Sequence, residues 1–313
     1  ESGAFGEHQH VDERAMDSGD LEREKGITIL AKNTAVRYSG KAAADAGLSE
    51  GVTINIIDTP GHADFGGEVE RVLRMADGAL LLVDAFDGPM PQTRHVLAKA
   101  LQTGLRVIVV INKCDRRDAR PHAVLDEVFD LFVELGADDR QLDFPVLYAS
   151  GREGWVRKEP HGPETDTALL FQVIESQVQP PAHDTAAPVR MQVTSIDHND
   201  FVGRIAIGRV QRGVLKDGAT LTAAGGTREA RNGRVTGLFV FDNLDRRAVK
   251  QVEAGDIAAV QGFPNIAIGE TLCDPAAVEP LPGISIDQPT ISMDFLVNDS
   301  PLGGQEGRFV TGR

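Results

Sequence analysis

Apolar and polar positions alternate in two distinct rhythms along the first 180 residues of the chain. Apolar, β-rich runs predict β-strands at 52–57, 79–83, 107–111 and 145–148. Between them, apolar residues that recur every three or four positions predict amphipathic helices at 68–76, 92–101, 122–135 and 167–178. Strands that alternate with helices predict a parallel-rich sheet with helices on both faces. Such α/β sheets bind their ligands at the carboxyl ends of the strands.

The stretch ahead of the first buried run has a weaker pattern. Residues 20–25 are charged and compatible with a short helix, which Gly26 ends, and a β-prone stretch then runs over 27–38. We expect its second half to pair with the strand 52–57 as a hairpin, because residues 39–51 have the glycine-rich and alanine-rich composition of a connecting loop. Both strings of chemical interest described below follow predicted strands, so we expect both at carboxyl ends of one parallel sheet.

A different pattern follows residue 188. Short alternating segments separated by glycine turns predict an all-β barrel, with strands at 189–193, 204–210, 219–222, 235–241 and 257–260. The stretches 180–188 and 280–289 have the composition of linkers, and one more alternating strand is predicted at 290–297. We therefore expect a first domain at 1–179, a linker at 180–188, a barrel at 189–279, and a linker with the first strand of a third domain at 280–313.

Composition narrows the class of protein. Of the 313 residues, 41% are hydrophobic and 25% are charged, as in ordinary soluble globular proteins. No apolar run approaches the roughly 18 residues of a membrane span, and the N-terminus lacks the basic and apolar regions of a signal peptide. The cysteines Cys114 and Cys273 fit no metal or redox spacing. We therefore expect a cytoplasmic protein that does not engage a membrane.

The net charge argues against one mode of binding. The formal net charge of −15 argues against sequence-independent adhesion to nucleic acid, which needs clustered Lys and Arg. The densest basic segment, 116–120, is interpreted as the solvated end of a loop.

The first chemical motif, Asn112-Lys113-Cys114-Asp115, follows the strand 107–111. A carboxylate at Asp115 can accept two hydrogen bonds, from the ring N–H and the exocyclic amino group of guanine, and adenine lacks this donor pair. Asn112 can bond the base and tie neighbouring loops together, and the aliphatic stem of Lys113 can lie over the purine. A polar turn that caps the next helix is the alternative. The position at the end of a buried strand favours recognition of a guanine nucleotide.

The second motif, Asp58-Thr59-Pro60-Gly61-His62, follows the strand 52–57. Asp58 can hold Mg²⁺ through water, because Mg²⁺ prefers oxygen ligands and retains several waters. Gly61 lets its backbone N–H approach a γ-phosphate oxygen without a Cβ in the way. His62 is then placed to orient or polarise the attacking water, since phosphoryl transfer depends on positioning and charge stabilisation. A histidine on a surface loop is the alternative in isolation, but the pentapeptide favours the catalytic role.

Two weaker candidates depend on their context. Thr28 can supply a hydroxyl to Mg²⁺ and a backbone contact to the γ-phosphate, although a threonine in a β-prone run is otherwise simply a strand residue. Ser150 and its neighbours, after the strand 145–148, can present backbone N–H groups to the guanine oxygen. A G-x-x-x-x-G-K-[S/T] phosphate loop occurs nowhere in the 313 residues, so the main phosphate contacts are unassigned.

Longer strings carry a resemblance to a known family. The run 17–29, together with the Asp58 motif, resembles translational GTPases of the elongation-factor class. The strings at 30–36, 62–71 and 297–301 narrow this resemblance to the TypA/BipA family of ribosome-associated GTPases. A LepA-type elongation factor is an alternative within the class, because it shares the Leu-Glu-Arg-Glu-x-Gly-Ile-Thr-Ile run.

The resemblance implies a fold and a set of site residues. The implied fold is α/β, a phosphate-loop-type GTPase domain, followed by an all-β translation-factor barrel and the start of a ferredoxin-like third domain. The implied roles are the first switch for Thr28, the second switch for Asp58, Gly61 and His62, guanine contacts for Asn112, Lys113 and Asp115, and the last nucleotide loop for Ser150. The chain departs from the family at Gly151-Arg152, where alanine and an apolar residue are usual.

By the same resemblance we expect hydrolysis of GTP to GDP and phosphate, with GTP or GDP and Mg²⁺ as cofactors. The implied partner is the ribosome, through rRNA, ribosomal proteins and tRNA, in translation or ribosome assembly and in stress or cold adaptation. We expect a monomer off the ribosome. The family's phosphate loop would precede Glu1 and its C-terminal domains would follow Arg313. We therefore expect this chain alone to be inactive, and a non-catalytic ribosome-binding module is the alternative from another class.

Overall fold

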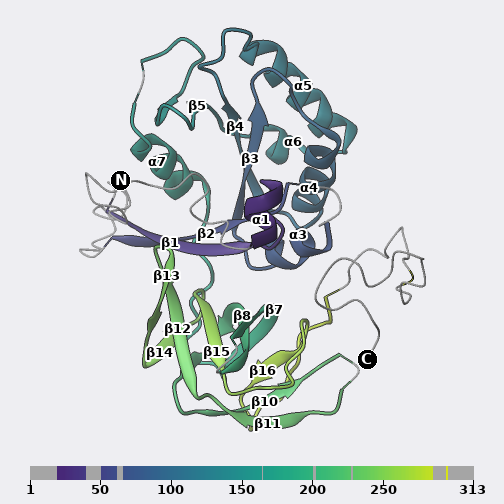
Figure 1. The fold of residues 1–313 in the computed structure, drawn as a ribbon, viewed down its shortest axis with the longest axis vertical. Coiled ribbons are helices and arrows are strands. Elements are labelled where there is room, and N and C mark those ends of the chain that lie inside the picture. The colour runs from purple at the N-terminus through teal and green to yellow at the C-terminus, as the bar shows by residue number, and fades with distance from the viewer. Residues whose placement is uncertain are drawn as a thin grey trace, which may run out of the picture.

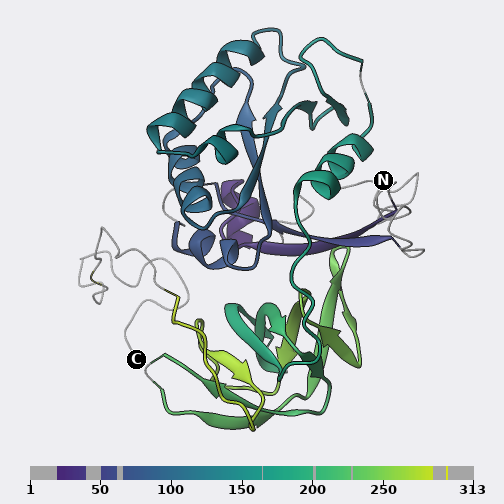
Figure 2. The same ribbon diagram turned by 180° about the vertical axis from the view of Figure 1, so that it is seen from behind.

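The structure consists of two domains, and Figure 1 shows the α/β domain above the β-barrel domain. The computed structural model of the protein describes residues 20–39, 51–61, 66–163, 165–199, 202–226, 228–284 and 294. An extended stretch after the last helix of the α/β domain leads into the first strand of the barrel (Figures 1 and 2). This order confirms the predicted fold class of an α/β domain followed by an all-β domain.

The sheet of the α/β domain consists of β3 (Gly78–Asp84), β4 (Arg106–Asn112), β5 (Val146–Ser150) and β6 (Trp155–Arg157), in that order. The first three strands are parallel, as the apolar runs predict, and β6 is antiparallel to β5. The sequence pattern predicts neither β6 nor the short helix α6 (Asp139–Leu142), because both are too short to show a period.

Helices cover both faces of this sheet, as predicted. On one face α4 (Pro91–Gln102) and α5 (Pro121–Glu134) share a core with Val109 of β4. On the other face α7 (Ala168–Gln177) shares a core with Ile108 of β4. Alternate residues of β4 therefore enter two different cores, which explains why this segment is continuously apolar.

The strand β3 forms the open side of the sheet. Within the described residues it pairs with β4, and no strand pairs with its other edge. The parallel register puts Leu80 and Leu82 beside Ile108 and Val110, on the face that α7 covers further along the sheet. Over β3, however, these two leucines are 39% and 62% exposed. An uncovered apolar surface next to an unpaired strand edge is a feature that soluble sheets normally avoid.

The strands β1 (Lys32–Tyr38) and β2 (Val52–Asp58) form the predicted antiparallel hairpin, with Lys32 opposite Asp58. The expectation that Asp58 ends a strand of the parallel sheet is wrong in this structure. Among the described strands, β2 pairs with β1 alone, so the hairpin is a separate two-stranded sheet. Figures 1 and 2 show it crossing near the N-terminal ends of β3 and β4.

The hairpin is buried against the barrel instead of the parallel sheet. Ala35 of β1 is 5% exposed and shares an apolar cluster with Ile207 and Phe241 of the barrel, against which Ile57 of β2 also packs. The backbone N–H of Asn243 donates to the carbonyl oxygen of Ala35 at 3.0 Å. These contacts explain the position of the hairpin, because they supply the burial that the open edge of β3 does not.

The segment before the hairpin also differs from the prediction. Residues 20–25 form the helix α1 (Asp20–Lys25), but residues 27–31 form a loop and not the start of a strand. The backbone N–H groups of Ile29 and Leu30 donate to the side chain of Glu22, so they are not available to a strand ladder.

The barrel is built from antiparallel strands around one apolar core. Its strands are β7 (Arg190–Asn199), β8 (Gly203–Arg212), β9 (Val214–Lys216), β10 (Thr220–Ala224), β11 (Arg231–Arg234), β12 (Gly237–Asp242), β13 (Asp245–Ala248), β14 (Gln251–Glu253), β15 (Ile257–Gln261) and β16 (Thr271–Cys273). The eight-stranded sheet has the order β11-β10-β16-β7-β8-β15-β12-β13, and β14 pairs with β9. All five predicted strands are present, whereas the other five are short and show no clear alternation of buried and exposed residues.

The helix α3 (Gly66–Leu73) and the turn after it connect the two domains. Arg209 of β8 donates to the carbonyl oxygen of Met75 at 3.2 Å and pairs with the Asp77 carboxylate at 2.8 Å. Val72 and Met75 lie in the same apolar cluster as the hairpin and barrel residues. The barrel therefore contacts both segments that flank the Asp58 motif. The predicted strand at 290–297 lies outside the described residues except for position 294.

Candidate functional site

The end of β4 is tied to the ends of both neighbouring strands. The side-chain oxygen of Asn112 accepts the backbone N–H of Gly151 at 2.9 Å, and its carbonyl oxygen accepts the N–H of Ala85 at 2.8 Å. The N–H of Cys114 donates to the carbonyl oxygen of Ala149 at 3.0 Å. The bond to Gly151 is the tie between neighbouring loops that the sequence predicts for Asn112. Three loops at the carboxyl edge of the sheet are thereby held as one unit.

Lys113 turns the chain sharply at this point. Its φ of +64° is in the left-handed region, which costs a residue with a Cβ about 1–2 kcal/mol. Its ammonium group pairs with the Asp84 carboxylate at 2.7 Å, and Asp84 also accepts the backbone N–H of Phe86 at 2.8 Å. Burial raises the pKa of Asp84, but the bonds from Lys113 and from two backbone N–H groups outweigh it, so the pKa lies below its ordinary value. Asp84 therefore stays ionised and holds Lys113 in place.

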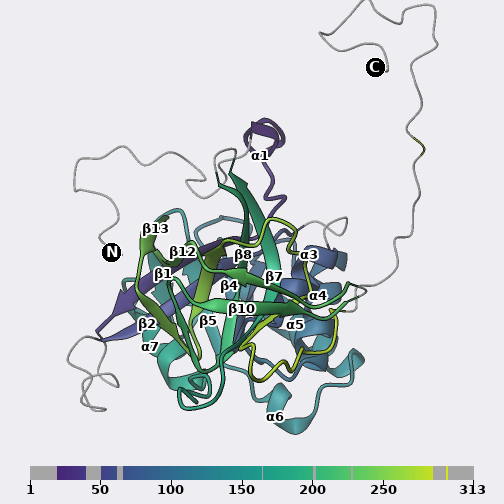
Figure 3. The same cartoon turned by 90° about the horizontal axis from the view of Figure 1, so that it is seen from below.

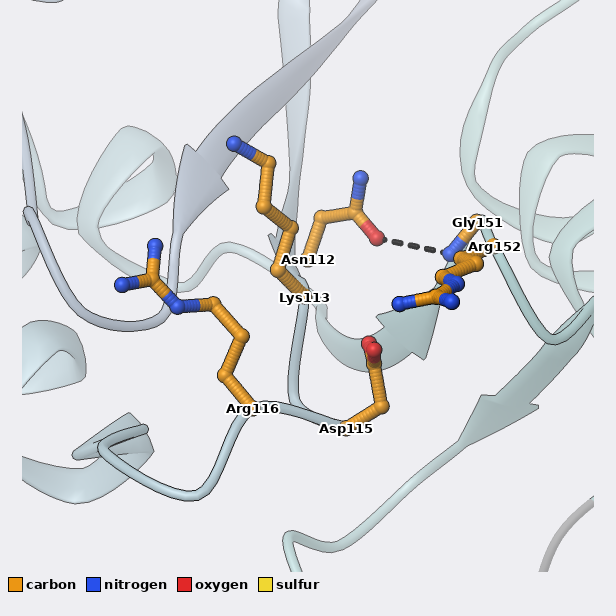
Figure 4. Close-up of a pocket in the computed structure, with 6 residues that line it drawn as sticks. All are labelled: Asn112, Lys113, Asp115, Arg116, Gly151 and Arg152. Atoms are coloured by element: carbon orange, nitrogen blue, oxygen red, sulfur yellow. Dashed lines mark hydrogen bonds between the residues drawn. The ribbon is translucent and has the colours of Figure 1, made fainter.

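A cavity of about 350 Å³ opens beside this turn, lined by Asn112, Lys113, Asp115, Arg116, Gly151 and Arg152 (Figure 4). Figure 4 shows the Asp115 carboxylate and the Asn112 amide facing the same space. Within the described chain, the Asp115 carboxylate forms no hydrogen bond or ion pair, so it is available to a ligand. The volume falls within the roughly 300–1,000 Å³ of small-molecule pockets.

Ser150 shapes the neighbouring loop from inside. It is 1% exposed, its hydroxyl oxygen accepts the N–H of Glu153 at 3.1 Å, and its carbonyl oxygen accepts the N–H of Gly154 at 2.8 Å. The N–H of Gly151, which the sequence offers to the guanine oxygen, donates to Asn112 here. Arg152 is a lining residue that the motif does not identify. In the sequence, Arg152 is marked only because this loop departs from the family pattern at Gly151-Arg152.

The Asp58 motif and Thr28 form a second group of candidates. Thr28 lies in the loop between α1 and β1, and the hairpin register puts Lys32, four residues later, opposite Asp58. Gly61 is exposed, and among the described residues no atom lies within 4 Å of the position that a Cβ would take. The predicted catalytic residue, His62, lies outside the described residues.

The structure does not bring these two groups together. The cavity lies at the carboxyl ends of β4 and β5, whereas the hairpin crosses near the opposite ends of the strands in Figures 1 and 2. The prediction that both motifs share one edge of a sheet is therefore wrong for the described chain. The physical reason is the unpaired edge of β3, which leaves the hairpin without a strand that would join it to the sheet.

The oxygen donors of the second group suit Mg²⁺. The hydroxyl of Thr28 and the carboxylate of Asp58 are hard oxygen ligands, and Mg²⁺ is typically bound by one or two protein oxygens together with waters and phosphates. No cluster of three or more His, Cys, Asp or Glu able to hold a metal ion occurs in the part of the chain that the structure describes. A hydroxyl and a carboxylate are oxygen donors of the kind that Mg²⁺ accepts when a nucleotide and water supply the other ligands.

Comparisons with known proteins identify both domains. Residues 1–180 match the model of the elongation factor Tu GTP binding domain, and residues 203–273 match that of elongation factor Tu domain 2. A large ribosomal subunit assembly factor BipA from Synechocystis is 50% identical over 313 residues, which are 100% of this chain and 51% of that protein. The protein of the same name from Bacillus subtilis is 48% identical over 313 residues, which are 100% of this chain and 49% of that protein.

An α/β domain that carries the Asn112–Asp115 motif, followed by a β-barrel, places the chain in the class of translational GTPases. Within this class, the chain belongs to the TypA/BipA family. The comparisons do not favour the LepA alternative. The chain spans about half the length of the curated relatives it matches. None of the helices in the described residues is long and apolar enough to cross a membrane.

Proposed function

We propose that this chain is the nucleotide-binding and barrel part of a GTP hydrolase that acts on the ribosome during assembly of the large subunit. The observation that carries the proposal is the cavity at the ends of β4 and β5, with an unpartnered Asp115 carboxylate beside a rigid Asn112. The relatives of the same family are named as assembly factors of the large ribosomal subunit.

Guanine selectivity follows from the chemistry of this cavity. Asp115 accepts the two N–H donors on one edge of guanine, and the amide of Asn112 bonds the base from the side. An adenine in the same position would cover the Asp115 carboxylate without pairing it, which costs roughly 1–3 kcal/mol for each missing bond. Lys113, held by Asp84, covers the purine with its aliphatic stem, and Ser150 keeps the last loop in shape.

Phosphate chemistry is assigned to the second group of residues. Thr28 and Asp58 hold the metal side of the triphosphate, Gly61 offers its N–H to the γ-phosphate, and His62 orients the attacking water. When bound, Mg²⁺ neutralises charge on the β- and γ-phosphates. Each of these residues belongs to a segment at the Asp58 end of the hairpin, so one movement of the hairpin brings them to the nucleotide together.

The open edge of β3 supports a location beside this strand for the remaining phosphate contacts. We infer that a strand and a helix ahead of Glu1 pair with β3 and cover Leu80 and Leu82, and that the phosphate loop joins the two. This segment would stand between β3 and the hairpin and bring both halves of the site to one edge. As it stands, the 313-residue chain is expected to bind guanine weakly and not to turn over GTP.

The remaining assignments follow the family. We infer binding to rRNA and ribosomal proteins, with tRNA as a further contact, a cytoplasmic location, and a monomer off the ribosome with no membrane association. The domain division is inferred as a GTPase domain at 1–179, a linker at 180–188, a barrel at 189–279, and the beginning of a third domain at 280–313.

The test is turnover of GTP by the whole protein with and without ribosomes. His62→Ala is expected to lower ribosome-stimulated hydrolysis about 100-fold or more, because a positioned acid or base contributes at least about that factor. Its GDP affinity should stay unchanged. His161→Ala removes an exposed histidine on a loop of the same domain and serves as the matched control. Full turnover in His62→Ala would contradict the catalytic assignment, and a wild-type rate that ribosomes do not raise would contradict the ribosomal one.

A further inference from the structure

On helix α1 a charged side chain is buried and an apolar side chain is exposed, the reverse of what their polarity predicts. Glu22 is 3% exposed, although its neighbour Leu21 is 61% exposed. Figure 3 shows α1 standing out from the body of the molecule. A buried carboxylate is stable only when its oxygens have partners, because an unpartnered charge away from water is strongly unfavourable. The contacts that cover Glu22 therefore indicate what it does.

Contacts from the segment that follows α1 reach both oxygens of this carboxylate. One carboxylate oxygen of Glu22 accepts the backbone N–H of Ile29 at 3.0 Å and that of Leu30 at 3.1 Å. The other oxygen pairs with the ammonium group of Lys32 at 3.1 Å, and both side chains are largely buried. The carbonyl oxygen of Glu22 accepts the N–H of Gly26 at 2.7 Å. The loop thus folds back onto the helix through one residue.

The shape of this loop depends on Gly26 and Glu22 together. Gly26 has a φ of +68°, a conformation that L side chains rarely adopt, and it turns the chain away from the helix. Thr28 lies between this turn and the two N–H groups that Glu22 binds. Its backbone is therefore fixed on both sides by contacts that lie within ten positions of Glu22 in the sequence.

We propose that Glu22 is a positioning residue that preforms the Thr28 segment and thereby sets the affinity for the triphosphate form of the nucleotide. This inference rests on the proposed function, since it takes Thr28 as the residue that meets Mg²⁺ and the γ-phosphate. Charge-assisted bonds to backbone N–H groups are about twice as strong as neutral ones, so the carboxylate holds the loop in one arrangement. A preformed loop does not lose that freedom on binding. The diphosphate offers Thr28 no γ-phosphate, so GDP gains nothing from this order.

The first experiment measures amide hydrogen exchange in the 313-residue chain without nucleotide. Glu22→Gln keeps the size of the side chain but removes its charge, and Glu22→Ala removes both acceptors. Protection of Ile29 and Leu30 is expected to fall about tenfold in Glu22→Gln and further in Glu22→Ala, as the loss of charged hydrogen bonds predicts. Glu24→Gln is the matched control, because Glu24 is on the same helix but 66% exposed and paired only with its neighbour Lys25 in the described chain. Unchanged protection in both Glu22 variants would overturn the proposal.

The second experiment titrates the whole protein, phosphate loop included, with GDP and with a non-hydrolysable GTP analogue. Glu22→Gln is expected to weaken the analogue about tenfold and to leave GDP unchanged, while Glu24→Gln leaves both unchanged. Equal weakening of both nucleotides would point to a merely structural role and contradict the inference. The inference would also be contradicted if Thr28→Ala bound the analogue weakly but Glu22→Gln bound it as tightly as the wild type. If Thr28→Ala binds the analogue normally, the assignment of Thr28 fails, and the exchange result on Glu22 is judged separately.

Discussion

Lys113 adopts a left-handed backbone conformation that a residue with a Cβ avoids unless its surroundings enforce it. The tie between Asn112 and Gly151 and the ion pair with Asp84 supply that enforcement. The strain lies at the turn that carries Asp115, and this turn presents the carboxylate to the cavity. At the scale of single residues, contacts within the chain therefore hold the lining of the proposed guanine pocket in place.

The ion pair between Asp84 and Lys113 predicts a pH dependence of stability. Because the folded pKa of Asp84 lies below its ordinary value of 3.8, its contribution to stability is present above that pH and is lost as the pH falls through the folded pKa. Asp84→Asn is expected to lower the melting temperature at pH 7 and to differ less from the wild type near pH 3. Asp130→Asn, exposed on α5, controls for the change of charge. A difference that is constant from pH 7 to pH 3 would contradict this role.

At the scale of elements, the sequence predicts long periodic segments well and segments set by tertiary contacts poorly. The runs that became β4 and β5 are apolar because helices cover both faces of the sheet there, and such apolar runs can be recognised in the sequence. The sequence does not predict the loop at 27–31, since its β-prone residues are held by Glu22 and not by a neighbouring strand. The sequence does not predict the position of β2 either, because that position depends on which partner strand is available. Asn112, Lys113 and Asp115 follow from their motif, and Arg152 is marked only by a departure from the family pattern, whereas the role of Glu22 emerges from contacts alone.

The open side of the parallel sheet predicts a difference between two forms of the protein. Leu82→Ser is expected to change the unfolding free energy of the 313-residue chain by less than about 0.5 kcal/mol, because Leu82 is 62% exposed there. In a form that carries the segment ahead of Glu1, the same change should cost about 1.5–3 kcal/mol, the value of a newly buried leucine. Leu81→Ser, at a residue 7% exposed on the opposite face, should destabilise both forms. Denaturant unfolding of the four variants measures this. Equal effects of Leu82→Ser in both forms would argue against a covering segment.

At the scale of the whole molecule, the barrel is attached to the parts of the GTPase domain that surround the Asp58 motif. Arg209 pairs with Asp77 after α3, and Asn243 bonds Ala35 of the hairpin. In the part of the chain that the structure describes, these contacts between the domains are made by the segments assigned to the phosphate. A movement of the hairpin toward the nucleotide would carry these contacts with it.

The central claim is that the cavity beside Asp115 binds guanine and that the phosphate contacts are completed by a segment ahead of Glu1. Calorimetric titration with GDP and with ADP, on the 313-residue chain and on a form that includes the phosphate loop, tests it most directly. The account predicts GDP binding weaker than micromolar for the 313-residue chain, micromolar or tighter for the longer form, and no measurable ADP binding by either. Asp115→Asn should weaken GDP roughly 100-fold in the longer form, as the loss of two charge-assisted hydrogen bonds predicts. Equal affinity for GDP and ADP, or micromolar GDP binding by the 313-residue chain, would contradict the account.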